Sequence, residues 1–264
     1  MDAAQIISSA AERARLANRT LVAASDAQRT AALNQIADAL VAQTDRIIAA
    51  NAEDMKRADE TNMATSMKDR LLLTAARIQG MADGARQVAA LPNPLGRTIN
   101  ARTLPNGLEL TQKSVPFGVV GMVYEARPNV TVDAAAILLK SGNSALLRGS
   151  SSATSSNTVL VEIMREVLAT TTISPDVIQN IPDSDRSTVT ALLHARGEVD
   201  LVIPRGSASL IRMVVDEATV PTIETGAGVC HVYVDDAADL DKALPILINS
   251  KTHRPSVCNA ARSE

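Results

Sequence analysis

The sequence predicts an α/β fold in which a Rossmann-like, doubly wound, mostly parallel sheet follows N-terminal helices and a β-hairpin arm. From residue 115 onward, short apolar runs alternate with helical segments, an order typical of a parallel sheet covered by helices on both faces. Hydrophobic residues make up 46% of the 264 residues but aromatic ones only 1%. The core must therefore be aliphatic, which suits Ala-rich helices packed on a Val- and Ile-rich sheet.

The first ninety residues have a helical pattern. Apolar positions such as Leu33, Ile36 and Leu40 recur at steps of three and four residues, which is the spacing of one helix face. We expect two or three helices here, with breaks near Asn62 and at the Leu-Pro-Asn-Pro run of residues 91–94.

Residues 98–115 change character and predict a β-hairpin. The run Leu-Pro-Asn-Gly-Leu at 104–108 places a tight-turn signal between two short extended stretches. An isolated hairpin is barely stable in water, so it must pair with something else. A partner subunit is one candidate, and we expect a homo-oligomer.

The predicted sheet is built from apolar runs that we expect to be buried on both faces. These strands lie at 118–124, 144–147, 177–181, 200–203, 220–223 and 229–234, and the helices between them at about 131–141, 153–169, 184–195, 207–217 and 237–250.

Charge and composition exclude several classes of protein. The net charge is −3, and the chain has no basic block with which to bind nucleic acid. The N-terminus lacks a basic signal-peptide region, and no apolar run reaches the ~18 residues of a membrane span. We therefore expect a soluble, cytoplasmic protein that contacts neither nucleic acid nor membrane.

No metal site or disulfide framework is expected. The two cysteines, Cys230 and Cys258, form no C-x-x-C pair, and no His cluster accompanies them. The acidic run 235–241 lacks the Gly and the terminal Glu of a calcium loop, so helix capping is the better interpretation.

Two strand-to-helix junctions suit a dinucleotide, because ligands of open α/β sheets bind at the carboxyl ends of the strands. At the first, Arg148 and Ser150 would hold a phosphate. No acidic residue that would favour a free ribose 2′-hydroxyl occurs between 148 and 161, which favours NADP over NAD. At the second, Gly206 and Ser207 open a helix whose amides would attract the pyrophosphate. Ordinary helix capping explains both junctions as well.

Two residues suit catalysis. Glu224 follows an apolar strand and precedes two glycines, where a general base would fit, although without Cys258 a solvated loop position is the better explanation. Cys258 follows basic residues that would lower its thiol pKa, as a nucleophile requires. Cys230 lies within an apolar strand pattern and is interpreted as a buried, inert cysteine.

Longer motifs carry a resemblance. Glu224-Thr-Gly-Ala-Gly, with Cys258 placed 34 residues later (258 − 224 = 34), resembles the paired carboxylate and nucleophile motifs of the aldehyde dehydrogenase superfamily. Residues 115–135 (VPFGVVGMVYEARPNVTVDAA) and 251–260 (KTHRPSVCNA) are similar to the γ-glutamyl phosphate reductase family within it. The similarity runs from the N-terminus to about Ala260 and implies an aldehyde dehydrogenase type of sheet.

The resemblance also implies a reaction. NADPH would reduce L-glutamyl 5-phosphate to L-glutamate 5-semialdehyde with release of phosphate, a step of proline biosynthesis that suggests functional coupling to glutamate 5-kinase. Cys258 would form a thioester, and Asn129 or the Cys258 backbone N–H would stabilise the oxyanion. Glu224 would handle a proton or shape the pocket, and Gly226 would contact the cofactor. On charge alone, the substrate phosphate and carboxylates would bind Arg127, His253 and Arg254.

The expected domains follow the same family. Residues 1–97 and 116–250 would form the NADP-binding domain, 98–115 the hairpin of the oligomerisation region, and 251–264 the start of a catalytic domain. Because the family continues well past the cysteine, we expect a truncated chain with weak or no turnover. An oxidative aldehyde dehydrogenase and a non-catalytic NADP-binding or assembly module are the alternatives.

Overall fold

The computed structural model describes residues 2–125, 127–181, 186–223, 228–253 and 260–263. The chain separates into two compact units, Met1–Glu224 and Thr225–Glu264.

The first unit opens with five helices, so the expectation of two or three is wrong. They are α1 (Ala3–Ala23), α2 (Asp26–Ala42), α3 (Thr44–Glu60), α4 (Thr65–Leu71) and α5 (Ala75–Ala90). The expected breaks near Asn62 and after residue 90 are present. Two further helix starts, those of α2 and α5, are set by local caps. Ser25 forms a capping box with Gln28 at the start of α2, and Thr74 caps α5. These breaks are too short to interrupt the apolar periodicity.

The sheet of this unit is parallel, as predicted, with the order β5-β4-β3-β6. Its strands are β3 (Val119–Tyr124), β4 (Ser144–Arg148), β5 (Ile178–Asn180) and β6 (Leu201–Arg205), and its crossover helices are α6 (Asn129–Lys140), α7 (Thr154–Leu168), α8 (Ser187–His194) and α9 (Ala208–Glu217). The predicted strand at 220–223 is reduced to one parallel bridge between Val202 and Thr222. The strand order reverses at β3, where doubly wound sheets bind their ligands.

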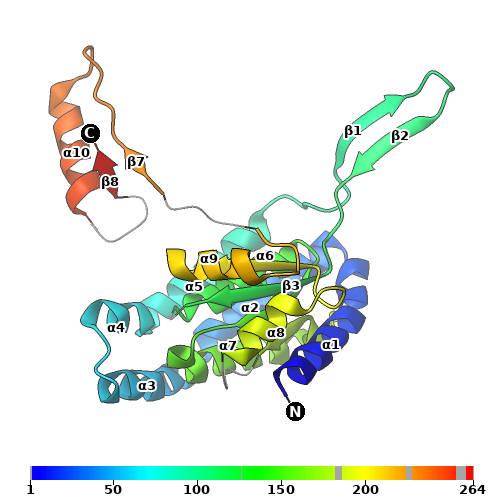
Figure 1. Ribbon diagram of the computed structural model, residues 1–264, viewed down its shortest axis with the longest axis horizontal. Coiled ribbons are helices and arrows are strands. Elements are labelled where there is room, and N and C mark those ends of the chain that lie inside the picture. Colours follow the sequence, from blue (N-terminus) through cyan, green and yellow to red (C-terminus); the bar gives the residue numbers. More distant parts are fainter. Residues whose placement is uncertain (1, 126, 182–185, 224–227, 254–259, 264) are drawn as a thin grey trace. The chain divides into compact units, whose positions relative to one another are not determined.

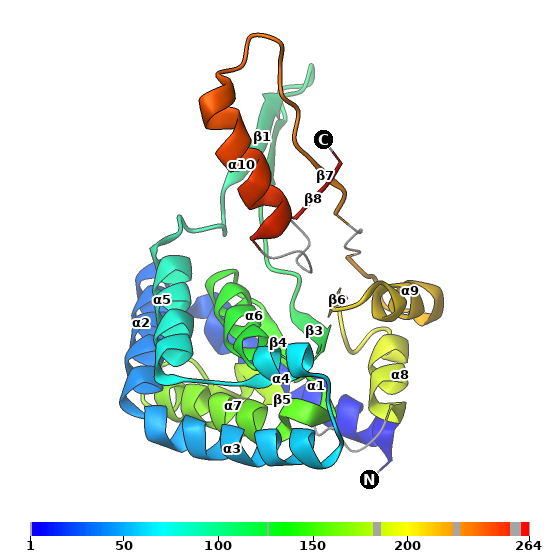
Figure 2. The same cartoon turned by 90° about the vertical axis from the view of Figure 1, so that its left-hand side faces the viewer.

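Helices cover both faces of this sheet, as Figure 2 shows from the side. Because side chains alternate along a strand, Val120 and Met122 of β3 join the core with α2, α5, α6 and α7. Val119 and Val123 point the other way and pack with α1 and α8. All six residues of β3 are buried, which explains its continuous apolar run.

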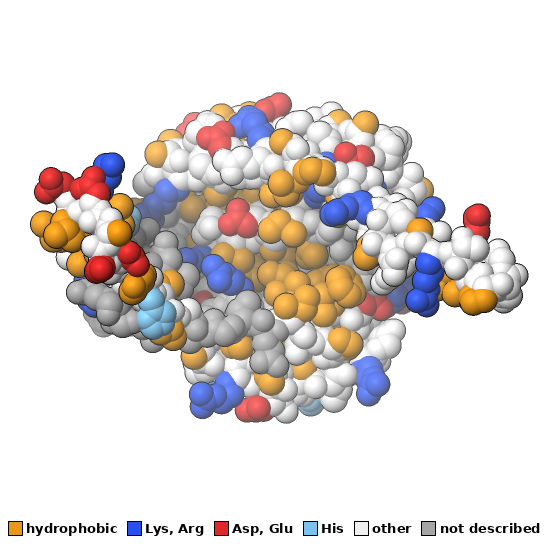
Figure 3. All heavy atoms as spheres, turned by 90° about the horizontal axis from the view of Figure 1, so that it is seen from above, with side chains coloured by type: hydrophobic (Ala, Val, Ile, Leu, Met, Phe, Trp, Pro, Cys, Tyr) orange, Lys and Arg blue, Asp and Glu red, His pale blue; other side chains and the backbone are white. Residues whose placement is uncertain are grey.

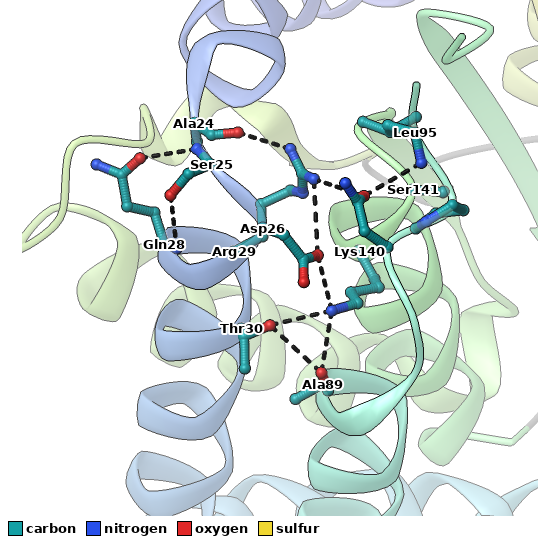
Figure 4. A network of polar contacts seen from close by, with 12 residues as sticks. Ala24, Ser25, Asp26, Gln28, Arg29, Thr30, Ala89, Leu95, Lys140 and Ser141 are labelled. Atoms are coloured by element: carbon teal, nitrogen blue, oxygen red, sulfur yellow. Dashed lines mark hydrogen bonds and ion pairs between the residues drawn. The ribbon is translucent and has the colours of Figure 1, made fainter. Parts of the chain in front are cut away.

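The predicted hairpin is present and forms an arm (Figure 1). Strands β1 (Thr98–Thr103) and β2 (Glu109–Lys113) pair antiparallel, and every residue in them is exposed. A partly buried polar network lies near its root, where α2, α5 and α6 meet (Figure 4). There the Lys140 ammonium lies 2.8 Å from Oδ1 of Asp26, and Arg29 donates to Asn93 at 3.0 Å. The network ties the chain that enters the arm to the helical core.

The second unit contains β7 (Cys230–His231), α10 (Leu240–Thr252) and β8 (Ala261–Ser263), with β7 and β8 parallel. The expected buried strand at 229–234 is therefore wrong. Among the described residues, strand pairing covers Cys230 and His231, and Cys230 is half-buried rather than a core residue. The interpretation of the acidic run as a helix cap is confirmed at Asp239, which accepts from the N–H groups of Asp241 and Lys242.

None of the helices in the described ranges has both the length and the apolar character needed to cross a membrane.

Candidate functional site: a cleft at the carboxyl ends of the strands

A cleft of about 750 Å³ lies where β3, β4 and β6 end. Its size lies within the range of small-molecule and cofactor sites. The lining includes charges of both signs, Glu125, Arg148, Arg186 and Glu217, and serines from two different strand-to-helix turns.

The first predicted phosphate site lies on this cleft. Arg148 ends β4, is half-buried, and donates through a terminal guanidinium nitrogen to the Gly149 carbonyl at 3.0 Å. Its Nε lies 3.4 Å from the Thr188 hydroxyl of α8. Ser150 follows, and its hydroxyl lies 2.8 Å from that of Ser152. The contacts with Gly149 and Thr188 hold the guanidinium group of Arg148 at the cleft wall.

The second predicted site lies across the same cleft. Ser207 caps α9, with its Oγ accepting from the Leu210 N–H at 3.3 Å, and Ser209 also lines the space. Gly206 precedes them, and a Cβ at this position would lie 2.6 Å from Cδ of Glu125. The Glu125 side chain therefore lies directly against the backbone of the turn, and a larger residue at position 206 would have to displace it. The structure thus brings Arg148, Ser150 and the Gly206–Ser207 turn together.

Asn129 and Arg127 lie at the start of α6. Asn129 is the first residue of the helix, and its Nδ2 donates to Oδ2 of Asp133 at 3.0 Å. Burial raises the pKa of the Asp133 carboxyl, although this hydrogen bond and the charge of Arg205 oppose the rise. One of the two amide hydrogens of Asn129 is therefore committed to Asp133. Arg127 is exposed just before the helix.

The other predicted site residues lie either outside the described residues or in the second unit. Glu224, Gly226, Arg254 and Cys258 are outside the described residues, so their roles stay predictions. His253 is exposed and follows the last residue of α10 in the second unit.

Sequence reasoning missed Glu125 and Arg186, which both line the cleft. The rule that selected Arg148, a charged residue next to a strand end, also selects Glu125, which directly follows β3. Arg186 carries no such signal, because it precedes a helix and enters the cleft only through the packing of α8. Within the part of the chain that the structure describes, no group of three His, Cys, Asp or Glu residues could hold a metal ion.

Comparison with known proteins identifies the family. A family model described as "aldehyde dehydrogenase family" matches residues 1–262, nearly the whole chain. The chain belongs to the aldehyde dehydrogenase family. The resemblance found in its motifs is thereby confirmed at this level.

Individual relatives show which members of this family the chain is similar to. The chain is 55% identical over 253 residues to a γ-glutamyl phosphate reductase of Thermobifida fusca, an alignment that covers 96% of this chain and 60% of that protein. It is also similar to the crystal structure of the enzyme of the same name from Thermotoga maritima, with a TM-score of 0.90, 41% identity, and coverage of 97% of this chain and 62% of that one. The crystal structure of γ-glutamyl phosphate reductase from Saccharomyces cerevisiae is similar as well, with a TM-score of 0.76 and 33% identity. That alignment covers 100% of this chain and 65% of the other.

The chain therefore spans about 60% of the length of the curated relative it matches. These matches confirm the predicted fold type.

Proposed function

We propose that this chain takes part in the NADPH-dependent reduction of L-glutamyl 5-phosphate to L-glutamate 5-semialdehyde and phosphate. The observation that carries the proposal is the 55% identity, over 96% of this chain, to a relative named γ-glutamyl phosphate reductase. Glutamate 5-kinase, which makes an acyl phosphate of this kind, would supply the substrate.

The cleft supports NADPH as the cofactor. Arg148 would bind the 2′-phosphate as a permanent cation, and Ser150 would add a hydroxyl donor. The turn at Gly206 and Ser207 would hold the pyrophosphate, because the first N–H groups of α9 attract an anion at the start of the helix. Bound NADPH would supply the hydride.

The protein's own chemistry would centre on Cys258. Its thiolate would attack the acyl carbon, and the C–O bond to phosphate would break to leave a thioester. After reduction, the C–S bond would break, the aldehyde would leave and the thiolate would return. Asn129, or the Cys258 N–H, would donate to the oxyanion that develops in both stages.

Glu224 would not activate water here, because hydrolysis would destroy the thioester; it would handle a proton or shape the pocket instead. Arg127, His253 and Arg254 would bind the substrate's phosphate and carboxylates.

The reverse reaction tests this proposal most directly. Purified chain, and the same segment extended to the length of its relatives, are mixed with glutamate 5-semialdehyde, NADP⁺ and phosphate. We expect NADPH to appear only when phosphate is present, and Cys258→Ala to abolish the signal in the extended chain. Oxidation that needs no phosphate would point to an oxidative aldehyde dehydrogenase instead. NADP binding without any turnover in the extended chain would identify a binding module.

A further inference from the structure

The start of α7 is capped by a carboxylate that comes from another helix. Ala153, at the N-cap position, has no side chain able to cap. Instead, Asp54 of α3 accepts from the backbone N–H groups of Ser155 at 3.0 Å and Ser156 at 2.8 Å. It also accepts from the Ser156 hydroxyl at 2.5 Å. The Asp54 side chain is 0% exposed, so a fully buried anion occupies the position of the missing cap.

The surroundings of Asp54 are built for this contact. Arg57 pairs with the carboxylate and donates to the Ser155 hydroxyl at 2.9 Å. The buried Asn51 donates to the Ser156 hydroxyl at 3.1 Å. The positive end of the α7 dipole and the Arg57 charge together offset the cost of burying the carboxylate.

This cap holds the turn that forms one wall of the cleft. Residues 149–153 join β4 to α7, and Ser150 and Ser151 of this turn line the cleft. The turn packs closely on α7, since a Cβ at Gly149 would lie 2.3 Å from Nδ2 of Asn157. Fixing the first turn of α7 therefore fixes the turn that carries the serines.

The cap also determines which helix is available to a cofactor phosphate. The first N–H groups of a helix bind anions well, but at α7 two of them already bind Asp54. At the start of α9 the cap is the neutral Ser207 hydroxyl, which is exposed on the cleft, and the Glu125 side chain lies against Gly206 just before the helix.

We propose that Asp54 is a positioning residue for the dinucleotide: by capping α7, it holds Arg148 and the turn that follows against the cleft. This inference rests on the cofactor site proposed above. Asp54 itself is buried and does not touch the cofactor.

The test compares three variants of the 264-residue chain. Asp54→Ala removes the cap, Asp54→Asn keeps its shape and one acceptor oxygen, and Asp59→Asn is the matched control. Asp59 lies on the same helix, but it is exposed and pairs only at the surface with Lys68, at 2.6 Å. Fluorescence titration gives the Kd for NADPH and for NADH, chemical unfolding gives stability, and each titration is repeated with added formate.

We expect Asp54→Ala to raise the Kd for NADPH at least tenfold and the Kd for NADH less, because in the proposed site Arg148 would bind the 2′-phosphate that NADH lacks. Formate should fill the vacated cap and restore NADPH affinity in this variant alone, which a general loss of stability would not produce. Asp54→Asn should be intermediate and Asp59→Asn unchanged.

Folded Asp54→Ala with an NADPH Kd within twofold of the wild type would overturn the positioning role and leave the proposed function intact. Failure of both Asp54 variants to fold, even in formate, would assign Asp54 to stability alone and overturn it too. A wild-type chain that binds neither nucleotide would instead overturn the proposed cofactor site, and the positioning role with it.

Discussion

The pKa values of two aspartates in the first unit are shifted in opposite directions. Burial raises the pKa of Asp133, and its hydrogen bond from Asn129 only partly compensates. Burial would also raise the pKa of Asp176, but hydrogen bonds from Arg165 and Gln179 outweigh it and hold that pKa below its usual value. Their effects on stability must therefore have opposite signs.

For Asp133, we predict that Asp133→Asn stabilises the fold at neutral pH. A folded pKa above the unfolded one means that the carboxyl costs nothing in acid, and that the cost develops as pH rises through the ordinary Asp range of about 4 toward the raised value. Urea unfolding of variant and wild type should diverge by up to about 1 kcal/mol between pH 3 and pH 7. A difference that does not change with pH would contradict this.

Asp176→Asn is the control of opposite sign. A depressed pKa contributes stability above the unfolded value, and that contribution is lost as pH falls through the folded one. We expect this variant to be less stable than the wild type at pH 7 by up to about 0.5 kcal/mol, because the ion pair with Arg165 is about one third exposed and solvent screens part of its attraction. The difference should shrink toward pH 3.

At the scale of elements, the start of β3 depends on a glycine. Gly118 has φ +124°, and a Cβ there would lie 2.3 Å from Oδ2 of Asp200. That carboxylate accepts from the Val119 N–H at 2.8 Å and pairs with Arg15 of α1 at 3.1 Å. The glycine therefore allows one side chain to join a strand, a loop and a helix.

We predict that Gly118→Ala destabilises the chain by about 1–3 kcal/mol, through backbone strain and displacement of Asp200. Gly80→Ala is the matched control. Gly80 lies inside α5 with nothing within 4 Å of its added Cβ, so alanine should stabilise the helix by about 0.5–1 kcal/mol. Thermal melts of both variants test this prediction, and equal changes in melting temperature for the two would contradict it.

At the scale of the whole molecule, the hairpin arm has no further strand partner among the described residues. Among the described strands, β1 and β2 pair only with each other, and Leu110 is 45% exposed. Figure 3 looks onto the face from which the arm rises and shows hydrophobic side chains gathered there. Phe117 and Ile137 are more than half exposed in the same unit. Such edges and patches favour association with another chain.

We predict that the chain self-associates through the arm, and that Leu110→Lys shifts it toward the monomer. Leu16→Lys is the control, since Leu16 is a leucine on α1, away from the arm, that is also exposed, to 56%. Sedimentation at several concentrations gives the masses. A wild type that is monomeric throughout, or a mass unchanged by Leu110→Lys, would show that the arm does not assemble this chain.

The sequence predicted those elements whose cause is local. The β3 run and the Leu-Pro-Asn-Gly turn can be recognised from neighbouring residues, and the alternation of strands with helices indicates parallel pairing, so the parallel sheet and the hairpin were predicted. The boundaries of the N-terminal helices were not, because caps such as Ser25 and Thr74 break a helix without breaking its apolar period. The strand at 229–234 failed for another reason: an apolar run becomes a strand only where a partner supplies hydrogen bonds.

The residues of the candidate site also divide into those that the sequence predicted and those that only the structure revealed. Residue types at strand ends and the long motifs determined the family, the fold type and the choice of Arg148, Ser150, Gly206 and Ser207. That Arg186 and Glu125 share their cleft, and that Asp54 caps α7 from a distance of 101 residues in sequence, was decided only by the tertiary structure. A carboxylate in the middle of a helix carries no local signal of this role; it acquires one only when packing removes it from water and gives it N–H groups to accept.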